Sequence, residues 1–322
     1  MIVVLALVSF VAFVLIQLPP GDFVKIYIQN LIASGRGPAD REAYEATLRK
    51  QYGLDQPFLV RYFKWVSRIC RGDFGYSLVL GRPVNEVIAE RLPLTVAVSI
   101  STLLLTYVIA VPIGIYSATH QYSPSDFGLM FVGFIGLAIP NFFLALLLMY
   151  FFNAAFGISV SGLFSPEYAV SSWSFAKLLD MLKHLPIPII VVATGGTAGL
   201  IRVMRATLLD ELQKQYVVTA RSKGVSERIL LWRYPVRVAI NPVISTVGWL
   251  LPAIVSGAEL TSIVLGLPTT GPVLLRALIN QDMYLAGSIV MMLSGLTVLG
   301  TAISDLLLVA VDPRIRFEKG NT

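Results

Sequence analysis

The sequence is poor in the residues that form disulfides and bind transition metals. Cys70 is its one cysteine, which excludes an internal disulfide and a metal site built from several cysteines. The two histidines, His120 and His184, lie far apart in the sequence, so a histidine-based zinc site is poorly supported as well. We therefore expect no bound metal.

Signatures of catalysis are also missing. The chain contains no GxxxxGK followed by serine or threonine, the loop that cradles nucleotide phosphates. It has no HExxH string, no paired-carboxylate string and no recognisable combination of nucleophile and base. The sequence therefore predicts a protein that is not an enzyme and carries no cofactor. If it moves a solute actively, the energy must come from another subunit.

Charged residues make up only 14% of the 322 residues, whereas apolar residues make up 56%. This is not the composition of a soluble protein. A helix needs about 20 apolar residues to cross the hydrocarbon of a bilayer, and two charge-free runs of 34 and 40 residues are long enough for a crossing and a loop. The charge-free runs cover 1–21, 92–125, 127–166, 184–201, 238–258 and 283–304. They predict an all-α integral membrane protein with six transmembrane helices.

The net charge of +6 raises the question of a nucleic-acid partner, because basic chains often bind phosphate. The basic residues are instead spread through loops between apolar segments, and no basic–aromatic face is evident. Membrane topology explains this distribution. We expect a lipid bilayer around the chain and no nucleic acid.

The apolar runs divide the chain into three parts. Residues 1–18 form the first membrane helix, which we expect to be retained, because no basic region precedes it and no small-residue cleavage site follows it. Residues 19–91 are a polar segment, in which helices are predicted over 41–52 and 58–69. We expect these helices to be amphipathic and to lie at the membrane edge, packed on the membrane helices or on a partner. Residues 92–322 hold the other five membrane helices.

Prolines mark several of the remaining membrane helices. The second, third, fifth and sixth helices are predicted over 94–118, 127–152, 241–264 and 284–311, and the fourth is predicted to start near residue 185. Pro112 and Pro140 lie inside the second and third helices and are expected to kink them. Pro186 stands at the start of the fourth helix, and Pro242 is expected to open the fifth.

A polar island covers residues 202–237, between the fourth and fifth membrane helices. It holds eight lysines or arginines against three acidic residues. We predict two short helices, Thr207–Lys223 and Ser226–Tyr234, with Ser226 as the cap of the second. Gly224 between them is expected to take a positive φ and end the first helix.

Two interpretations of the island stay open. A structured basic helix–turn–helix indicates a surface on which another protein docks, whereas a plain cytoplasmic loop is basic because such loops usually are. With six membrane helices, the short segments on the same side of the membrane as the island carry eleven lysines or arginines. The short loops on the other side carry three. This bias predicts a cytoplasmic island, cytoplasmic N- and C-termini and an extracytoplasmic 19–91 segment.

The island also carries a resemblance to a known family. Its string YVVTARSKG, residues 216–224, resembles the EAA…G loop of binding-protein-dependent ABC importer permeases, in the form found in the oligopeptide/dipeptide group. Ala220 and Gly224 match the alanine and glycine of that pattern. Val218 stands where the pattern has a glutamate, and Arg237 stands where other branches have a proline.

Further strings resemble the same group in the correct order along the chain. LPTTGP (267–272) resembles the family's PGLG-type loop, altered by Thr269 and Thr270. The other strings are LPPGD (18–22), YGLDQP (52–57), RGDFGYSL (71–78), RPV (82–84) leading to ERLPLT (90–95), and the ending DPRIR (312–316). The resemblance covers nearly the whole chain, from Leu18 to Phe317.

The resemblance implies a type I ABC importer permease architecture in a bacterial or archaeal inner membrane. It implies four kinds of neighbour: a second related permease that completes a heterodimer, two ATP-binding cassette ATPases, an extracytoplasmic solute-binding protein and the bilayer. The implied mechanism is alternating access, in which the ATPases close on ATP and carry the island of each permease inward.

In this family the loop seats in a cleft on the ATPase. Carried over to this sequence, that role falls on Thr219, Ala220, Lys223, Gly224, Val225 and Glu227. Glu259, near the far end of the fifth membrane helix, is a second candidate. It either stands at the mouth of the solute path or belongs to a local hydrogen-bond network, and a position near a helix end favours the network.

Other functions stay possible from the sequence alone. The family carries mainly peptides, but similar permeases carry oligosaccharides, nickel or other small solutes. An ion-coupled secondary transporter usually needs ionisable residues deep in the membrane, and the second and third predicted membrane helices have none. An assembly or insertion factor that moves no solute is the third alternative.

Overall fold

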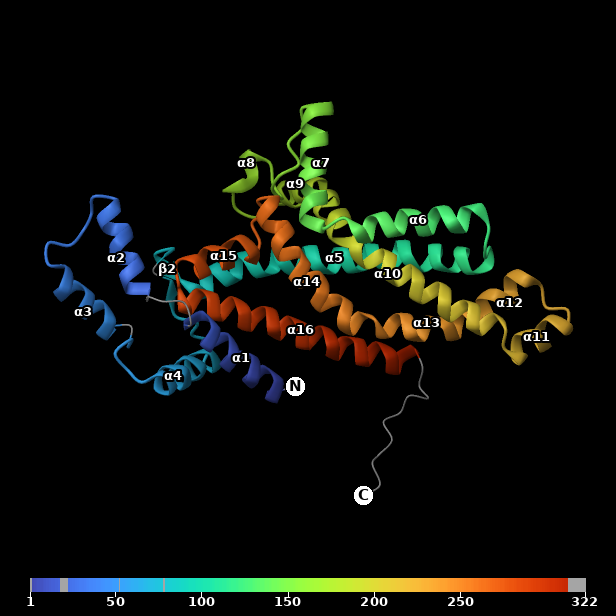
Figure 1. Cartoon of the computed structure of the whole chain (residues 1–322), viewed down its shortest axis with the longest axis horizontal. Coiled ribbons are helices and arrows are strands. Elements are labelled where there is room, and N and C mark those ends of the chain that lie inside the picture. The colour runs from blue at the N-terminus through green and yellow to red at the C-terminus, as the bar shows by residue number, and fades with distance from the viewer. Residues whose placement is uncertain (1, 18–22, 52, 78, 312–322) are drawn as a thin grey trace, which may run out of the picture. The chain divides into compact units, whose positions relative to one another are not determined.

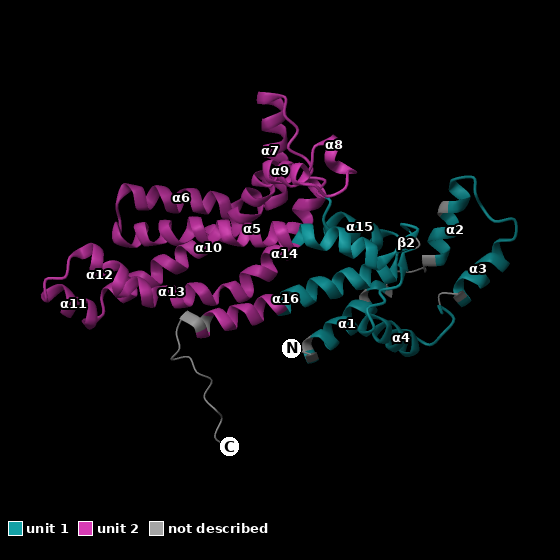
Figure 2. Ribbon diagram, turned by 180° about the vertical axis from the view of Figure 1, so that it is seen from behind, with its two compact units in different colours: residues 1–95, 268–298 teal, residues 96–267, 299–322 magenta. Residues whose placement is uncertain are grey.

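The computed structural model describes residues 2–17, 23–51, 53–77 and 79–311. Within these residues the regular structure is helical apart from one two-stranded hairpin, which confirms the all-α class. The chain divides into two compact units, residues 1–95 with 268–298 and residues 96–267 with 299–322 (Figure 2). Figure 1 labels the elements in chain order. The LPPGD string and the DPRIR ending lie outside the described residues.

Unit 1 contains the polar segment and the ends of two long helices, α5 and α16, that continue into unit 2. Its elements are α1 (Ile2–Gln17), α2 (Phe23–Ala33), α3 (Arg41–Gln51), α4 (Phe58–Cys70), β1 (Tyr76–Ser77), β2 (Arg82–Pro83), the first part of α5 (Val84–Thr119), α15 (Thr270–Ile279) and the first part of α16 (Met283–Val311).

Helix α4 packs on α1 through aromatic side chains. Phe13 of α1 is buried against Tyr62 and Trp65 of α4, and the hydroxyl groups of Tyr62 and Ser9 lie 2.8 Å apart. Apolar residues at helical spacing supply this face, so the helix predicted over 58–69 is confirmed. The helix predicted over 41–52 is confirmed as α3, with Tyr52 outside the described residues.

Two further contacts organise unit 1. Val24 and Ile28 of α2 bury themselves against Leu48 of α3. In the hairpin, the hydroxyl of Ser77 donates to Asp282 just before α16, at 2.7 Å. The hairpin contact joins residues 205 positions apart and has no local pattern, whereas the apolar residues at 24, 27, 28 and 31 have a helical spacing that was missed.

Unit 2 is built around the long helix α10, which packs against α6, α7, α13 and α14. Its elements are the rest of α5, α6 (Pro124–Ala138), α7 (Asn141–Phe156), α8 (Pro166–Ala169), α9 (Phe175–His184), α10 (Pro186–Leu212), α11 (Gln215–Ser222), α12 (Glu227–Arg233), α13 (Pro235–Ser245), α14 (Val247–Val264) and the rest of α16. The main core joins α5, α10 and α13, with Met204, Leu208 and Val243 fully buried.

The third predicted membrane helix is broken rather than kinked. Helices α6 and α7 meet at an angle of 100° across a short break at Ile139 and Pro140 (Figure 1). Ile139 has extended backbone angles, because the proline that follows it disfavours the helical conformation. Pro140 stands at the N-cap of α7. The proline therefore ends one helix and starts the next.

Four described helices are long and apolar enough to cross a membrane: α5, α10, α14 and α16 up to Leu307. The broken pair α6–α7 adds a fifth if it counts as one crossing. Helix α1, with 16 residues, is shorter than these. The structure thus supports a multi-pass membrane protein with four or five clear candidates for the six predicted membrane helices.

Several predicted boundaries were wrong. Helix α5 begins at Val84, ten residues before the predicted start at Leu94. Pro242 does not open the fifth membrane helix: it lies inside α13, and the break before α14 falls at Thr246. Pro112 lies inside α5, which continues through it, whereas Pro186 opens α10 as predicted.

Candidate functional site

The polar island folds into an elbow, which we define as α11, the turn 223–226 and α12. The first predicted helix, Thr207–Lys223, is wrong in extent, because α10 runs on to Leu212 and α11 begins only at Gln215. The second is confirmed as α12, with Ser226 in the capping position. Its side chain makes no capping hydrogen bond.

Gly224 ends α11 as the sequence predicts, with φ of +78°. Its amide donates to the carbonyl of Arg221 at 3.0 Å, and the amide of Val225 donates to the carbonyl of Ala220 at 3.4 Å. This pair of hydrogen bonds is the Schellman arrangement that favours glycine after a helix. No atom outside the local backbone lies within 4 Å of where a Cβ would be, so the backbone angle alone selects glycine.

A small apolar cluster holds the two arms of the elbow together. Val217 and Ala220 of α11 are buried against Leu230 of α12, and Val225 and Tyr234 pack partly against them. Leu230 is fully buried. The arms are therefore fixed relative to each other by side-chain packing as well as by the turn.

An ion pair closes the surface of the elbow. The guanidinium of Arg221 donates to both carboxylate oxygens of Glu227, at 2.7 and 3.1 Å. The side chains are 48% and 68% exposed. This hydrogen-bonded contact holds the pKa of the Glu227 carboxyl below its ordinary value, so Glu227 is ionised at neutral pH.

The six residues predicted for coupling all lie on the elbow but do not all face outward. Thr219, Lys223, Gly224 and Glu227 are exposed. Ala220 is buried, with 6% exposure, and Val225 is half-buried against the same cluster. Four of the six therefore lie on the outer surface of the elbow, and the other two pack inside it.

Exposed apolar side chains on the elbow were missed by the sequence analysis. Ile229 and Trp232 of α12 are 55% and 58% exposed, and Val218 of α11 is 44% exposed. Ile229 and Trp232 are three residues apart on a helix whose buried residue is Leu230, so helical spacing within this short helix was the available signal.

The elbow is joined to the membrane helices by packing. Leu231 of α12 and Leu212 of α10 both pack on the α5–α10–α13 core. The hydroxyl of Tyr216 donates to the carboxylate of Glu211 at the end of α10, and burial together with this acceptor raises the pKa of Tyr216. The elbow is therefore held to the end of α10 by both apolar and polar contacts.

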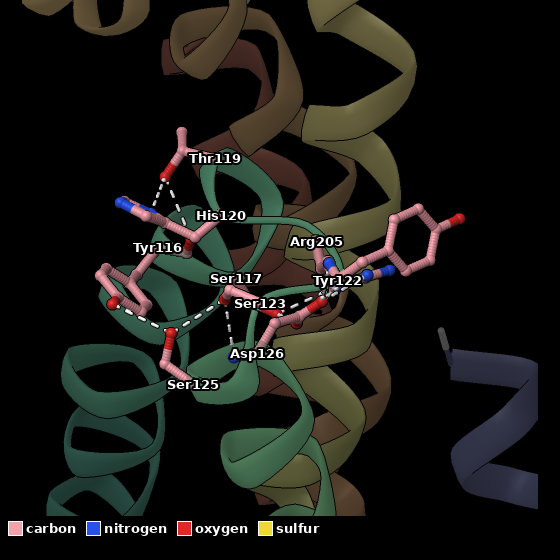
Figure 3. A network of polar contacts seen from close by, with 9 residues as sticks. All are labelled: Tyr116, Ser117, Thr119, His120, Tyr122, Ser123, Ser125, Asp126 and Arg205. Carbon is pink, nitrogen blue, oxygen red and sulfur yellow. Dashed lines mark hydrogen bonds and ion pairs between the residues drawn. The ribbon is translucent and has the colours of Figure 1, made fainter.

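A polar network ties the 119–126 connector to α10 at the same end of that helix (Figure 3). Arg205 donates to Asp126 through Nη2 at 2.8 Å and through Nε at 3.2 Å. Asp126 also accepts hydrogen bonds from the hydroxyl of Ser117 and from the backbone amide of Tyr122. Its side chain is only 1% exposed, and that of Arg205 is 18% exposed. We call these residues the connector clamp.

The other ionisable candidate, Glu259, lies on α14 and is half-buried there, five residues before that helix ends. It belongs to a different helix from the elbow residues. Across the described part of the chain, no three histidine, cysteine, aspartate or glutamate side chains gather as a metal-binding group.

Comparison with known proteins gives matches along almost the whole chain. The family model "Binding-protein-dependent transport system inner membrane component" matches residues 110–317, and the model of the N-terminal part of such components matches residues 1–99. The chain is 33% identical over 312 residues to the oligopeptide transport system permease protein AppB of Bacillus subtilis, covering 96% of this chain and 94% of that protein.

Two further relatives agree with this match. A probable peptide ABC transporter permease of Sinorhizobium fredii is 29% identical, covering 98% of this chain and 96% of the relative. A putative peptide permease of Brucella ovis is 31% identical, covering 94% of this chain and 92% of the relative. With a family model that spans residues 110–317 and relatives matched from end to end, the chain belongs to the family of binding-protein-dependent transport system inner membrane components.

Proposed function

We propose that this chain is the permease subunit of an ATP-driven importer and forms half of the path for short peptides. The observation that carries this proposal is the end-to-end similarity to peptide permeases, which covers 94–98% of the chain in three relatives. The chain itself supplies membrane helices and a helical elbow. Hydrolysis of ATP belongs to separate ATPase subunits.

The assembly contains a second related permease, two ATPases and an extracytoplasmic solute-binding protein. Exposed apolar side chains on α6 and α7 support an apolar neighbour, lipid or the second permease: Phe131, Phe143, Leu147, Tyr150 and Phe151 are each at least 43% exposed. The N- and C-termini and the elbow face the cytoplasm. Two observations support this topology: the connector and the elbow lie at one end of α10, and basic residues are concentrated there.

The elbow is the surface that seats in the ATPase. Its exposed coupling residues Thr219, Lys223 and Glu227 surround the turn, and the exposed Ile229 and Trp232 add apolar area. An aromatic side chain beside charged residues is typical of the energetically important part of a protein interface. Ala220, Val225 and Gly224 give the elbow its shape.

The connector clamp extends the coupling from the elbow to α6. When the ATPase moves the elbow, Leu231 and Leu212 carry the displacement into the α5–α10–α13 core. Arg205 then carries it from α10 to Asp126 at the start of α6. Glu259 on α14 is half-buried near the end of its helix, where a local hydrogen-bond network is favoured over the solute path.

Solute uptake by reconstituted vesicles tests the proposal. The permease pair, the ATPases and a binding protein loaded with a labelled tripeptide are assembled, and uptake is measured with ATP inside the compartment that holds the ATPases. We expect ATP-dependent peptide uptake that persists when ionophores collapse all ion gradients. Uptake of an oligosaccharide instead would overturn the peptide assignment, and uptake that needs only an ion gradient would overturn the importer.

Cross-linking tests the elbow separately. Cys70 is replaced by serine, and Lys223→Cys introduces a single reactive site on the exposed turn. We expect a short bifunctional reagent to join it to the ATPase, with a yield that changes on ATP binding. Ser159→Cys, an exposed position on the α7–α8 loop, serves as the matched control and should give no such product. Equal yields at both positions would contradict an elbow-specific contact.

A further inference from the structure

An open cleft of about 650 Å³ lies beside α4 in unit 1, and none of its lining residues belongs to the elbow or to the connector clamp. Residues of α4 form most of its wall, and the start of α16 contributes Met283 and Tyr284. Basic side chains dominate its polar lining: Lys50, Arg61, Lys64, Arg68 and Arg71. Among the described residues that line it, none carries a carboxylate.

The basic residues of the cleft follow the period of one helix. Arg61, Lys64, Arg68 and Arg71 are spaced three, four and three residues apart, which places them on one face of α4 and its C-terminal end. Arg68 binds Asp73 at 2.9 Å and stacks over the ring of Tyr284 at 5.6 Å. The Asp73 carboxylate thus compensates one cation of the stripe, and the described lining of the cleft adds no further carboxylate.

Exposed apolar side chains lie next to this basic stripe. On α4, Val60 and Phe63 line the cleft and are 41% and 65% exposed. The opposite face of α4 packs on α1, a helix whose own Val3 and Leu7 are 78% and 63% exposed. A helix with cations on one side, valine and phenylalanine beside them and an apolar helix behind it is typical of a segment at a membrane interface.

From this arrangement we propose that the α4 cleft binds the headgroup of an anionic phospholipid, with the phosphate on the basic stripe and the acyl chains along Val60 and Phe63. A soluble anion would match the cations but not the exposed apolar residues beside them. An anionic lipid matches both, because its charge and its chains are joined in one molecule. The bound lipid would fix α4 and α1 to the bilayer surface.

Native mass spectrometry of the assembled transporter tests the proposal. The complex is reconstituted in nanodiscs of phosphatidylglycerol and phosphatidylcholine, and the lipids that it retains on release are counted. The test variant is Lys64→Gln/Arg71→Gln, whose parent side chains are exposed. The matched control is Arg36→Gln/Arg41→Gln, which removes the same charge from exposed positions of unit 1 outside the cleft.

We expect the native complex to retain phosphatidylglycerol in preference to phosphatidylcholine. Each basic residue near a membrane surface is worth about 1 kcal/mol, or roughly a fivefold change in affinity. The double variant at α4 should therefore bind phosphatidylglycerol about 25-fold more weakly, whereas the control should bind it like the native complex. Equal retention of the two lipids, or equal losses in the two variants, would overturn the proposal.

Cys70 supplies a second measurement, because it is the last residue of α4 and is exposed. A fluorophore on it, in a complex whose partner subunits lack accessible cysteines, should be quenched by phosphatidylglycerol with a headgroup-proximal nitroxide. If inorganic phosphate at millimolar concentration abolishes this quenching, the site belongs to soluble anions. If the α4 variant loses the binding protein but keeps its lipid, the surface belongs to that protein. Either result overturns the lipid assignment.

Discussion

Two arginine–carboxylate pairs of unit 2 have almost the same geometry and very different surroundings. Asp126 and Arg205 approach to 2.8 Å, and Glu227 and Arg221 approach to 2.7 Å. The Asp126 side chain is 1% exposed, whereas that of Glu227 is 68% exposed. Water competes for the second pair and is excluded from the carboxylate of the first.

This difference teaches that burial, rather than contact distance, decides what each pair does. An exposed ion pair contributes little to stability because solvent screens it. A buried carboxylate that loses its partner destabilises the folded state, because its charge is then neither paired nor solvated by water. The connector clamp therefore fixes the 119–126 connector to α10, whereas the exposed Arg221–Glu227 pair adds little to the packing and the turn that hold the elbow.

The largest effect is expected when the clamp is broken. Arg205→Ala leaves the buried Asp126 carboxylate with only Ser117 and the Tyr122 amide as donors. Removing one partner of a buried pair typically costs about 3–5 kcal/mol. We expect the thermal unfolding midpoint of the permease within the assembled complex to fall and transport to be lost. Thermal unfolding of the assembled complex in detergent measures this change.

The conservative variant separates position from charge. Arg205→Lys keeps the positive charge but not the two parallel hydrogen bonds of a guanidinium. We therefore expect its thermal unfolding midpoint to lie between those of the native protein and of Arg205→Ala. If coupling passes through the clamp, this variant should hydrolyse ATP at near-native rates with a lower yield of peptide per ATP. An unchanged ratio of transport to hydrolysis would leave the clamp with a purely structural role.

The next effect concerns the inside of the elbow. Leu230→Ala removes a fully buried side chain from the cluster that joins α11 and α12. Because this cluster is small, we expect the free energy of unfolding to fall by about 2 kcal/mol, which is the low end of the range for truncating a buried leucine to alanine. Hydrogen exchange of the 215–233 amides should rise, and ATPase stimulation by loaded binding protein should fall.

Ile229→Ala is the matched control at the neighbouring position. Its side chain is 55% exposed, so the elbow should stay folded with unchanged hydrogen exchange. If Ile229 contacts the ATPase, cross-linking from the turn should nevertheless weaken. Increased exchange in this variant would contradict the assignment of Ile229 to the outer surface.

Strain at the turn gives a smaller effect. Gly224→Val forces a β-branched residue to φ of +78°, which costs about 1–2 kcal/mol. We expect normal membrane insertion with lost transport and lost ATPase stimulation. Gly72→Val imposes similar strain at φ of +76° with no neighbour within 4 Å, and it should leave stimulation intact. A Gly224→Val complex whose ATPase remains fully stimulated by solute would contradict the coupling role.

Much of the elbow could be predicted from the sequence because its signals are local. Gly224 lies between two short helical segments, and the positive φ follows from the absence of a side chain. The end of α10 could not be predicted in the same way. No glycine or proline marks residues 213–214, and α10 continues to Leu212 because Leu208, Leu209 and Leu212 pack on the core.

The clamp and the broken helix depend on contacts that no local pattern reports. Asp126 and Arg205 are 79 residues apart, and each alone is typical of a charged residue near a helix end. Pro140 indicated a kink, but the 100° angle depends on how α6 and α7 pack on α10. The aromatic spacing of α4 was enough to predict that helix, whereas its basic cleft needs residues from α3 and α16.

The smallest effect on stability is expected at the exposed pair. Arg221 lowers the pKa of Glu227 from its ordinary 4.5. For a carboxyl whose pKa is lower in the folded state, the stabilisation is present above the ordinary pKa and is lost as the pH falls through the lowered value. Between roughly pH 6 and 8 the pair therefore stays ionised, and we expect coupling to be independent of its titration.

Glu227→Gln tests the pair without changing its size. Because both side chains are well exposed, we expect the thermal unfolding midpoint to stay within the error of the measurement, in contrast with the large fall at the clamp. ATPase stimulation should drop only if Glu227 itself contacts the ATPase, and Arg221→Gln should then have a weaker effect. A midpoint that falls as far as in Arg205→Ala would refute the argument that burial distinguishes the two pairs.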